Sequence, residues 1–151
     1  MIETGEACLN GDKYAPHLVD QYSGYHILET LRQRNKASLS AWLSRSIYWI
    51  IRQFDCDVIA IRSDNERGYR TYLEEMTKHL GIRLEYTVVD TPSQNGGAEV
   101  AGGSLSARAR ALRLHANLPE ELAHEMYRSA AYILNQTPAA RLDWKTPYEV
   151  A

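Results

Sequence analysis

The sequence predicts an α/β protein, and three observations carry this prediction. Residues 37–54 repeat apolar side chains at three- and four-residue steps, the period of an amphipathic helix. The near-continuous apolar run of residues 57–61 follows, which is typical of a strand buried on both faces of a sheet. Helical spacing in residues 69–80 and alternation in residues 83–89 then repeat the order of helix and strand. Such alternation predicts a sheet flanked by helices.

Length, charge and cysteine content narrow the class of protein. The 151 residues are enough for one domain with one core. The formal net charge of -2 argues against a protein that binds nucleic acid over its whole surface, but it does not exclude a local basic face. The two cysteines, Cys8 and Cys56, stand in no metal-ligand spacing and favour a reducing compartment. Because no signal peptide and no membrane-spanning run is visible, we expect an intracellular protein of the nucleus or cytoplasm, with no membrane partner.

Two antiparallel strands are expected before the long helix. Residues 10–12, Asn-Gly-Asp, are typical of a tight turn, because Asn-Gly takes positive φ at little cost. Residues 17–19 form a short apolar run, and residues 25–31 combine aromatic and β-branched side chains. The Tyr-Ser-Gly sequence of residues 22–24 supplies a turn between them.

The carboxyl-terminal half is predicted to be helical. A loop rich in Pro, Ser, Asn and Gly over residues 90–97 leads into a helix that ends at about His115. Two glycines at 102–103 cost about 1 kcal/mol each relative to Ala and mark a weak point or a break. Pro119 and the acidic residues after it begin another helix, and residues 144–151 are expected to form a loop or terminal turn.

Two carboxylates stand where α/β proteins place their active sites. Asp64 stands among the polar residues that come after the predicted strand of residues 57–61, and Glu99 follows a Gly-rich turn at the start of a predicted helix. Carboxylate oxygens are the ligands that Mg²⁺ prefers, so the two side chains could share one divalent ion. Each also has an ordinary interpretation, because a strand-terminal Asp often caps a turn and a lone Glu is often a solvated helix residue.

Polar and basic side chains near Glu99 are candidates for contact with nucleic acid. Gln94 and Asn95 are candidate substrate-contacting amides, with turn formation as the equal alternative. The predicted helix then carries arginines with no acidic residue around them, namely Arg108, Arg110 and Arg113. They form either a patch for DNA phosphates or a solvated helix surface, because positions 108 and 110 point to different helix faces. The five histidines fit no zinc spacing, and we expect them on the surface or in strands.

Short motifs run in order along nearly the whole chain. They are GDKY at 11–14, VDQYSGY at 19–25, IRSDNE at 61–66, GI at 81–82, TPSQNGGAE at 91–99, the ARA run around Arg108, LPEEL at 118–122, YILNQTP at 132–138 and WKTPYE at 144–149. Each motif alone is weak, but together and in this order they are specific. On these motifs the chain resembles the integrase catalytic core of copia-type long-terminal-repeat retrotransposons.

The resemblance implies a ribonuclease-H-like fold, which is a five-stranded mixed sheet flanked by helices, with an Asp, Asp, Glu triad that binds divalent metal. Asp64 matches the second aspartate of that triad, and Glu99 matches its glutamate. The implied cofactor is Mg²⁺ or Mn²⁺. The implied substrates are the DNA ends of the element and a target DNA, in 3′-end processing and strand transfer. The resemblance leaves open RNA as a further partner and assembly into a homo-oligomer.

The chain departs from the family's pattern at its start. The first aspartate of the triad belongs in the first, central strand, at Met1 or just before it, where no acidic residue stands. We therefore expect residues 1–151 to form one catalytic core with an incomplete first strand and impaired activity. Glu66 stands where the family often has Gly, and Val100 where it usually has Arg. The alternatives are a non-catalytic nucleic-acid-binding or oligomerisation remnant and an unrelated ribonuclease-H-like nuclease.

Overall fold

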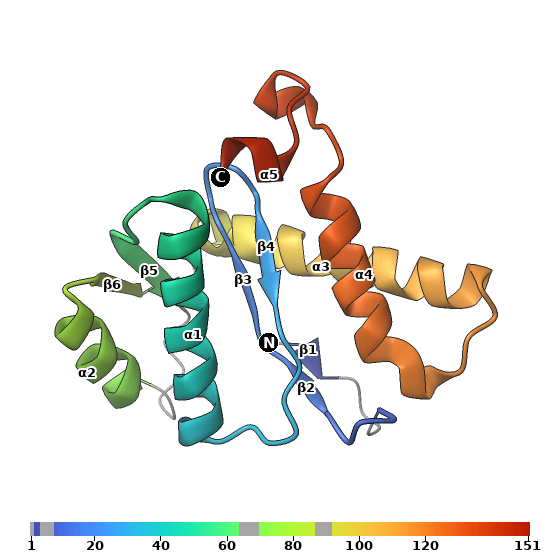
Figure 1. Ribbon diagram of the computed structural model, residues 1–151, viewed down its shortest axis with the longest axis horizontal. Coiled ribbons are helices and arrows are strands. Elements are labelled where there is room, and N and C mark those ends of the chain that lie inside the picture. The colour runs from blue at the N-terminus through green and yellow to red at the C-terminus, as the bar shows by residue number, and fades with distance from the viewer. Residues whose placement is uncertain (1, 4–7, 64–69, 87–91) are drawn as a thin grey trace. The chain divides into compact units, whose positions relative to one another are not determined.

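The chain divides into two compact units. The computed structural model describes residues 2–3, 8–63, 70–86 and 92–151 (Figure 1), and it describes side chains in residues 8–63, 70–86 and 97–151. The first unit comprises Met1–Arg34 and Gly97–Ala151, and the second unit comprises Asn35–Gly96. Among the described residues, no helix is both long enough and apolar enough to cross a membrane.

Strands and helices follow each other broadly as the sequence predicts. The first unit contains β1 (Ile2–Glu3), β2 (Tyr14–Ala15), β3 (His17–Val19), β4 (His26–Leu28), most of α3 (Pro92–His115), the 3₁₀ turns η1 (Glu120–Leu122) and η2 (Ala140–Leu142), α4 (Ala123–Asn135) and α5 (Pro147–Val150). The second unit contains α1 (Lys36–Phe54), β5 (Ala60–Ser63), α2 (Arg70–Leu80) and β6 (Arg83–Tyr86). The predicted α/β class is therefore confirmed. Residues 144–151 were expected to form a loop or a terminal turn, and Pro147–Val150 form the single turn of helix α5.

A proline interrupts the strand pairing of the first unit. β1 pairs antiparallel with β2, and β3 pairs antiparallel with β4. The bridge between Tyr14 and Leu31 keeps the register of the β3–β4 pair, so β2 and β3 are two parts of one strand. Pro16 lies between them and has no N–H to donate to a ladder. The predicted hairpin is confirmed, with ladders that end on either side of Pro16.

The predicted turn before β2 forms as its residues suggest. Gly11 has a φ of 81°, a left-handed conformation that glycine adopts without strain. The side-chain oxygen of Asn10 accepts a hydrogen bond from the Asp12 N–H at 3.0 Å. The backbone closes the turn through a bond from the Gly11 N–H to the Cys8 carbonyl at 2.7 Å.

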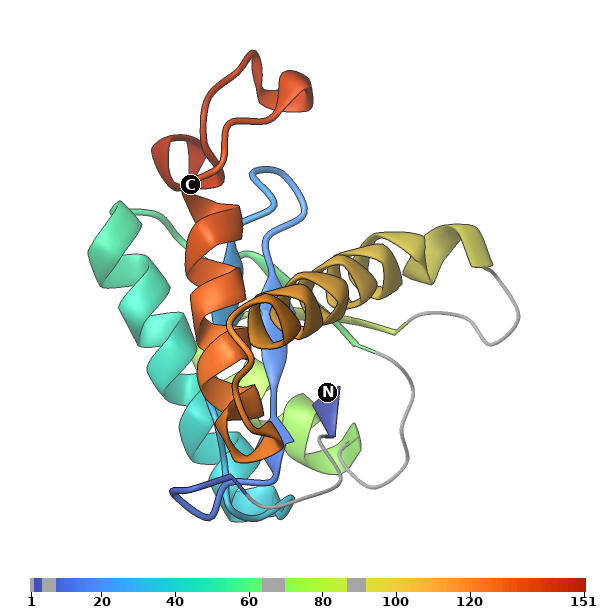
Figure 2. The same cartoon turned by 90° about the vertical axis from the view of Figure 1, so that its right-hand side faces the viewer.

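The core of the first unit lies where α3 and α4 cross (Figure 2). Small residues at the crossing let the two helices approach, and the buried set is Leu105, Ala109, Ala130 and Ala131. α3 continues through Gly102 and Gly103, so the predicted break there is wrong. Leu105, two residues after these glycines, is fully buried, and its packing stabilises the helix against the cost of the glycines.

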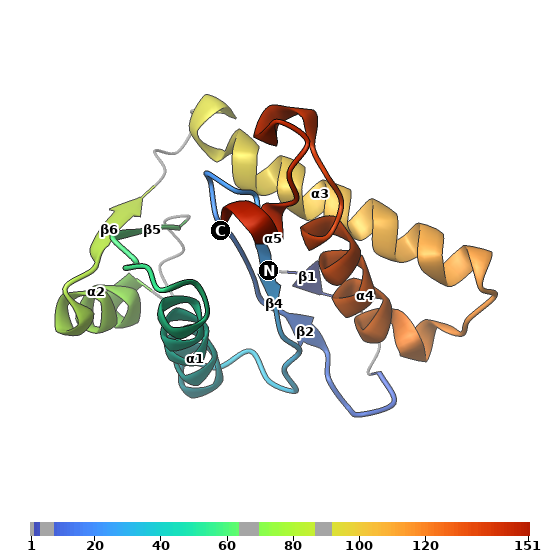
Figure 3. The same cartoon turned by 45° about the horizontal axis from the view of Figure 1, so that its top comes forward.

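The second unit places α1 and α2 beside a parallel pair of strands (Figure 3). α1 begins at the cap residue Asn35, whose side chain accepts from the Ser38 N–H, and it buries Leu39, Trp42, Leu43 and Ile47. β5 and β6 pair in parallel. The strand predicted at 57–61 begins later, at Ala60, and Ile59 is 72% exposed, so burial of that run on both faces is wrong. In all, the described strands form three two-stranded ladders.

Candidate functional site

β5 ends directly before Asp64. Its last residue, Ser63, lies opposite Tyr86, the last residue of β6. Asp64 itself lies outside the described residues, as does Glu66. The predicted strand ended at residue 61, whereas β5 continues to Ser63, and the role of Asp64 stays a prediction.

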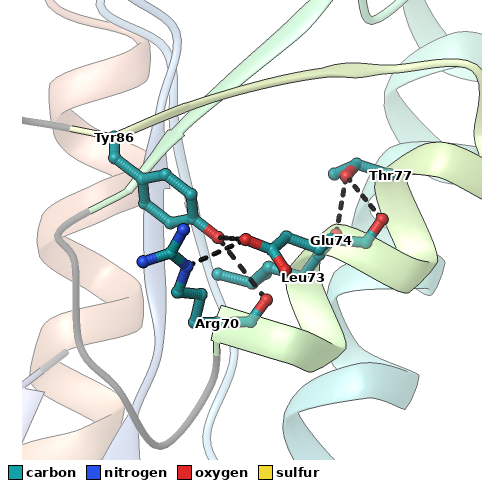
Figure 4. Close-up of polar contacts among 5 residues, drawn as sticks. All are labelled: Arg70, Leu73, Glu74, Thr77 and Tyr86. Atoms are coloured by element: carbon teal, nitrogen blue, oxygen red, sulfur yellow. Dashed lines mark hydrogen bonds and ion pairs between the residues drawn. The ribbon is translucent and has the colours of Figure 1, made fainter.

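A cluster of three side chains joins the start of α2 to the end of β6 (Figure 4). The Arg70 Nε donates to the Glu74 Oε1 at 2.9 Å, one helical turn further along. The Tyr86 hydroxyl lies 3.3 Å from the same Glu74 oxygen and 3.5 Å from the Arg70 carbonyl oxygen. The guanidinium carbon of Arg70 lies 5.2 Å from the centre of the Tyr86 ring, a cation–π distance.

Charges in this cluster keep each group in the protonation state that its contacts require. The hydrogen bond from Arg70 lowers the pKa of the Glu74 carboxyl, which favours the ionised acceptor. Partial burial and the negative charge of Glu74 raise the pKa of the Tyr86 hydroxyl, so it keeps its proton and can donate. The cluster therefore persists across the neutral pH range.

A second set of ion pairs lies on the β5–β6 ladder, and one of them, Arg62–Glu85, joins the two strands. The Glu85 carboxylate accepts from Arg62 Nη2 at 2.8 Å and from Arg83 Nε at 3.0 Å. The hydrogen bond from Arg62 is the main cause that lowers the pKa of Glu85. These arginines are thus partnered within the strand pair, and no prediction had assigned them a role.

Glu99 lies on α3, in the part of that helix whose side chains the structure describes (residues 97–115). Its side chain is exposed, and no hydrogen bond or ion pair among the described residues involves its carboxylate. Gln94 and Asn95 belong to α3 by their backbone, which begins at Pro92, while their side chains lie outside the described set. Turn formation, the alternative for these two residues, is therefore wrong for their backbone, because Pro92 starts the helix earlier than expected.

The three arginines of α3 differ in exposure. Arg110 is exposed, whereas Arg108 and Arg113 are half-buried. The Arg113 Nη1 donates to the Leu118 carbonyl oxygen at 3.3 Å, which ties the end of α3 to the following loop. Arg110 is consequently the most accessible cation of the three for a phosphate.

A buried polar connection between β4 and α4 was not predicted. The Asn135 side chain accepts from the His26 N–H at 2.7 Å and donates to the His26 carbonyl at 2.8 Å. His26 stacks on His17, with ring centres 5.1 Å apart and a 2.9 Å contact between ring nitrogens. Burial, and then the charge of His26, lower the pKa of His17 to about 4. The YILNQTP motif could have pointed to Asn135, since a polar residue inside an apolar helix stretch needs a partner.

The expectation that all histidines lie on the surface or in strands is wrong for His124. This side chain is on α4 and is 0% exposed. His17 and His26 lie in strands as expected, and His79 and His115 are exposed. Burial is the main cause that lowers the pKa of His124, so it is neutral near pH 7.

Acidic and histidine side chains form no metal cluster of their own within the described ranges. There, no three residues among His, Cys, Asp and Glu lie together in a way that could hold a metal ion. Asp64 is outside those ranges, and Glu99 has the oxygen donors that Mg²⁺ or Mn²⁺ binds.

Sequence comparison finds a relative in a plant transposon. The chain is 35% identical over 91 residues to the retrovirus-related Pol polyprotein from transposon TNT 1-94 of Nicotiana tabacum. The match covers 60% of the chain and 7% of the polyprotein, so the chain spans a small part of that relative. No family model matches the chain.

Solved structures with the same fold are similar at low sequence identity. The simian T-cell lymphotropic virus intasome in complex with PP2A regulatory subunit B56 gamma has a TM-score of 0.73 at 19% identity, over 95% of this chain and 50% of that chain. The catalytic core domain of BIV integrase has a TM-score of 0.69 at 20% identity, over 90% and 83% of the two chains. The HTLV-2 integrase catalytic core domain in complex with magnesium, in a trimeric form, has a TM-score of 0.66 at 16% identity, over 91% of each chain. The predicted ribonuclease-H-like fold is confirmed.

Proposed function

We propose that the chain acts in DNA integration, by metal-dependent 3′-end processing and strand transfer, because it is similar to a retrotransposon Pol polyprotein and has the fold of integrase catalytic cores. In strand transfer a DNA 3′-hydroxyl attacks a target phosphodiester, a new phosphodiester forms, and the bond to the old 3′ oxygen breaks. The observation that supports this proposal most is the agreement of two independent comparisons. Sequence similarity leads to a retrotransposon polyprotein, and the fold leads to retroviral integrase cores.

We assign the chemistry to Asp64 and Glu99, which would hold the divalent ion. Mg²⁺ or Mn²⁺, when bound, would supply the positive charge that aligns the attacking and leaving oxygens and offsets charge on the phosphate. The exposure of the Glu99 side chain supports this role, because a metal ligand must be accessible to the ion and to the DNA phosphate. Glu99 is the last residue of the TPSQNGGAE motif, one of the motifs on which the resemblance to the family rests.

DNA is the proposed partner, as element ends and as target. Arg108, Arg110 and Arg113 would contact phosphates, with Arg110 first because it is exposed and Arg113 last because Leu118 already accepts one of its N–H groups. Gln94 and Asn95 would contact substrate from the first turns of α3. Intasome and trimeric assemblies among the similar structures support a homo-oligomer as the active form. The compartment that follows from this role is the nucleus, reached from the cytoplasm.

The proposal is tested by joining of DNA ends. The purified chain is mixed with short duplexes whose ends are randomised, with Mg²⁺ or Mn²⁺, and joined products are sequenced. We expect metal-dependent joining that Asp64→Asn and Glu99→Gln each reduce by at least about 100-fold. Glu120→Gln, another exposed glutamate, serves as the matched control and should leave joining unchanged.

Other outcomes point to other functions. DNA binding without joining under either metal would overturn the proposal in favour of a non-catalytic nucleic-acid-binding or oligomerisation domain. Cleavage of RNA in RNA–DNA hybrids, with no joined DNA, would indicate a ribonuclease-H-like nuclease instead. A homo-oligomer is tested separately by the mass of the chain in solution with and without DNA.

A further inference from the structure

The β5–β6 pair has one charged face. Along each strand, successive side chains point to opposite faces of the ladder. One face carries Arg62 from β5 with Arg83 and Glu85 from β6, and the parallel register places Arg62 beside Glu85. Tyr86, the next residue after Glu85, lies on the opposite face, where its hydroxyl reaches α2. The three charged side chains therefore lie on the face of the ladder away from α2.

The Glu85 carboxylate binds both arginines of this face. Its Oε2 accepts from Arg62 Nη2 at 2.8 Å and from Arg62 Nε at 3.2 Å. Its Oε1 accepts from Arg83 Nε at 3.0 Å, and Arg83 Nη2 also lies 3.0 Å from that oxygen. Each oxygen thus meets two nitrogens of one guanidinium group, which fixes the direction of both planar groups.

Positive charge exceeds negative charge in this cluster, because two guanidinium groups share one carboxylate. The side chains of Arg62 and Arg83 are 41% and 68% exposed. A guanidinium group has several N–H donors, and no described residue other than Glu85 accepts from either side chain. Both arginines therefore keep N–H groups that an anion could accept.

The stability of the strand pair does not account for the second arginine. Exposed ion pairs contribute little to folding, and Arg62 alone already joins β5 to Glu85 of β6. Arg83 is on the same strand as Glu85, so its ion pair connects no further element. It adds a second oriented guanidinium group beside the first, and such groups match the oxygens of a phosphate, which accept paired N–H donors.

We propose that Arg62 and Arg83 together bind a backbone phosphate of DNA on this face of the second unit. The inference rests on the proposed function, which makes DNA the partner. Because Glu85 already holds both guanidinium groups, less side-chain freedom is lost when the phosphate binds. The three arginines of α3 belong to the first unit, so this site gives the second unit a DNA contact of its own.

The salt dependence of DNA binding tests the site directly. A fluorescent duplex of random sequence is titrated with the purified chain in EDTA at several KCl concentrations, and its anisotropy gives the Kd. We expect Arg62→Ala and Arg83→Ala each to raise the Kd about fivefold at low salt. The double variant should lower the slope of log K against log salt by about 1, since one lost phosphate contact releases about one counterion fewer.

Substitution by lysine separates charge from geometry. Arg62→Lys and Arg83→Lys keep the positive charge but lose the planar fork that binds two oxygens. We expect each variant to keep the salt slope of the wild type, with a Kd about threefold higher. Wild-type Kd values in both lysine variants would show that charge alone suffices, and would overturn a site built from paired guanidinium groups.

Arg70→Ala is the matched control, because it also removes an exposed arginine from an Arg–Glu pair. The Arg70 side chain is 53% exposed and donates to Glu74 at 2.9 Å, within α2. Its Kd and salt slope should stay at wild-type values, and urea denaturation should give the same midpoint for all variants. An equal rise of the Kd in Arg70→Ala would attribute the effect to net charge and overturn the inference. Unchanged binding in the double variant of Arg62 and Arg83 would overturn it as well.

Binding and joining can fail separately. If the wild-type chain binds DNA but joins none, the proposed function fails, and the comparison of Kd values still decides the role of the two arginines. If the chain joins DNA and the double variant binds it like the wild type, the phosphate site fails and the proposed function stands. A wild-type chain that binds no duplex DNA, or that uses these arginines for single-stranded RNA or inorganic phosphate instead, would overturn the inference.

Discussion

Residues of the family motifs make different contacts in two regions of the chain. In the β3–β4 hairpin and its surroundings, motif residues are held by contacts within the first unit. Asp20 accepts from the Ser23 N–H and hydroxyl at 2.7 and 2.6 Å, and Arg141 donates to the Ser23 carbonyl at 2.7 Å. Glu99, in the TPSQNGGAE motif, is exposed and has no described partner for its carboxylate.

The difference separates residues that maintain the fold from residues that are available for chemistry. A polar side chain whose hydrogen bonds are satisfied inside the protein is explained by folding alone. An exposed carboxylate without such bonds has no role in stability that the described contacts reveal. Substitutions in the hairpin region should thus change the free energy of unfolding, and substitutions at Glu99 should change activity.

Asn135→Ala should give the largest loss of stability. The change leaves the N–H and the carbonyl of buried His26 without partners, and each unsatisfied group costs about 1–3 kcal/mol. We expect the free energy of unfolding to fall by about 3 kcal/mol, measured by urea denaturation. Tyr132→Ala, on an exposed position of the same motif, is the control and should cost less than about 0.5 kcal/mol. Equal losses in both variants would contradict the role of Asn135.

Acid should weaken the same hairpin through His17. The unfolded chain binds a proton on this residue near pH 6.5, whereas the folded chain does so near about 4. Between these values the unfolded state holds more protons, so stability falls as pH drops from 6.5 to 4 and this loss is complete below 4. We expect about 2 kcal/mol, followed by urea denaturation across that range.

His17→Gln provides the control for the acid effect. It removes the titrating ring and should remove most of the loss between pH 6.5 and 4. His26, whose pKa is also lowered, mainly by burial, contributes the remainder in the same direction. An unchanged pH dependence in His17→Gln would contradict the assignment to His17.

Gly24→Ala should destabilise the turn of the VDQYSGY motif. Gly24 has a φ of 73°, and a Cβ there would lie 1.9 Å from the Arg141 Nη2. Left-handed backbone and close approach together should cost about 1.5 kcal/mol in thermal or urea unfolding. In an Arg141→Ala background the close approach is gone, so the cost of Gly24→Ala should shrink. A cost that stays the same in both backgrounds would attribute the effect to the backbone alone.

Thr146→Ala should have a smaller effect, because it removes one helix cap. The Thr146 hydroxyl accepts from the Glu149 N–H at 3.1 Å, and the Glu149 carboxylate accepts from the Thr146 N–H at 2.7 Å, which is a capping box. We expect a loss of about 1 kcal/mol in urea unfolding. Thr137→Ala is the control from another Thr-Pro pair, since its hydroxyl donates to the Ile133 carbonyl and caps no helix start. An equal loss at Thr137 would contradict the capping argument.

Much of the fold was predictable from local patterns. The helix at 36–54, the turn at Gly11 and the hairpin follow from apolar period and from turn residues, whose effects act over a few positions. The break at Pro16 was not predicted, although proline has no N–H for a ladder and the signal is local. The short β5 was not predicted because its length depends on which strand it pairs with. Burial of His124 on α4 was likewise missed, since an isolated histidine carries no periodic signal.

The candidate site was predictable to a lesser degree. The resemblance gave Asp64 and Glu99 by position, and the bounds of β5 and the exposure of Glu99 agree with it. The Arg70, Glu74 and Tyr86 cluster was not predicted. It joins a helix start to a strand end, and neither Arg-Glu spacing nor a lone tyrosine in a strand indicates that they will meet.

Glu99→Gln should have the smallest effect on stability and the largest on joining. The substitution keeps the size of an exposed side chain and breaks no described hydrogen bond, so the free energy of unfolding should change by less than about 0.5 kcal/mol. The same variant removes a charged oxygen ligand, and strand transfer should fall by at least about 100-fold. Urea denaturation and the joining assay on one protein preparation measure both. A stability loss near that of Asn135→Ala would move Glu99 into the group of fold-maintaining residues and remove the contrast between the two regions.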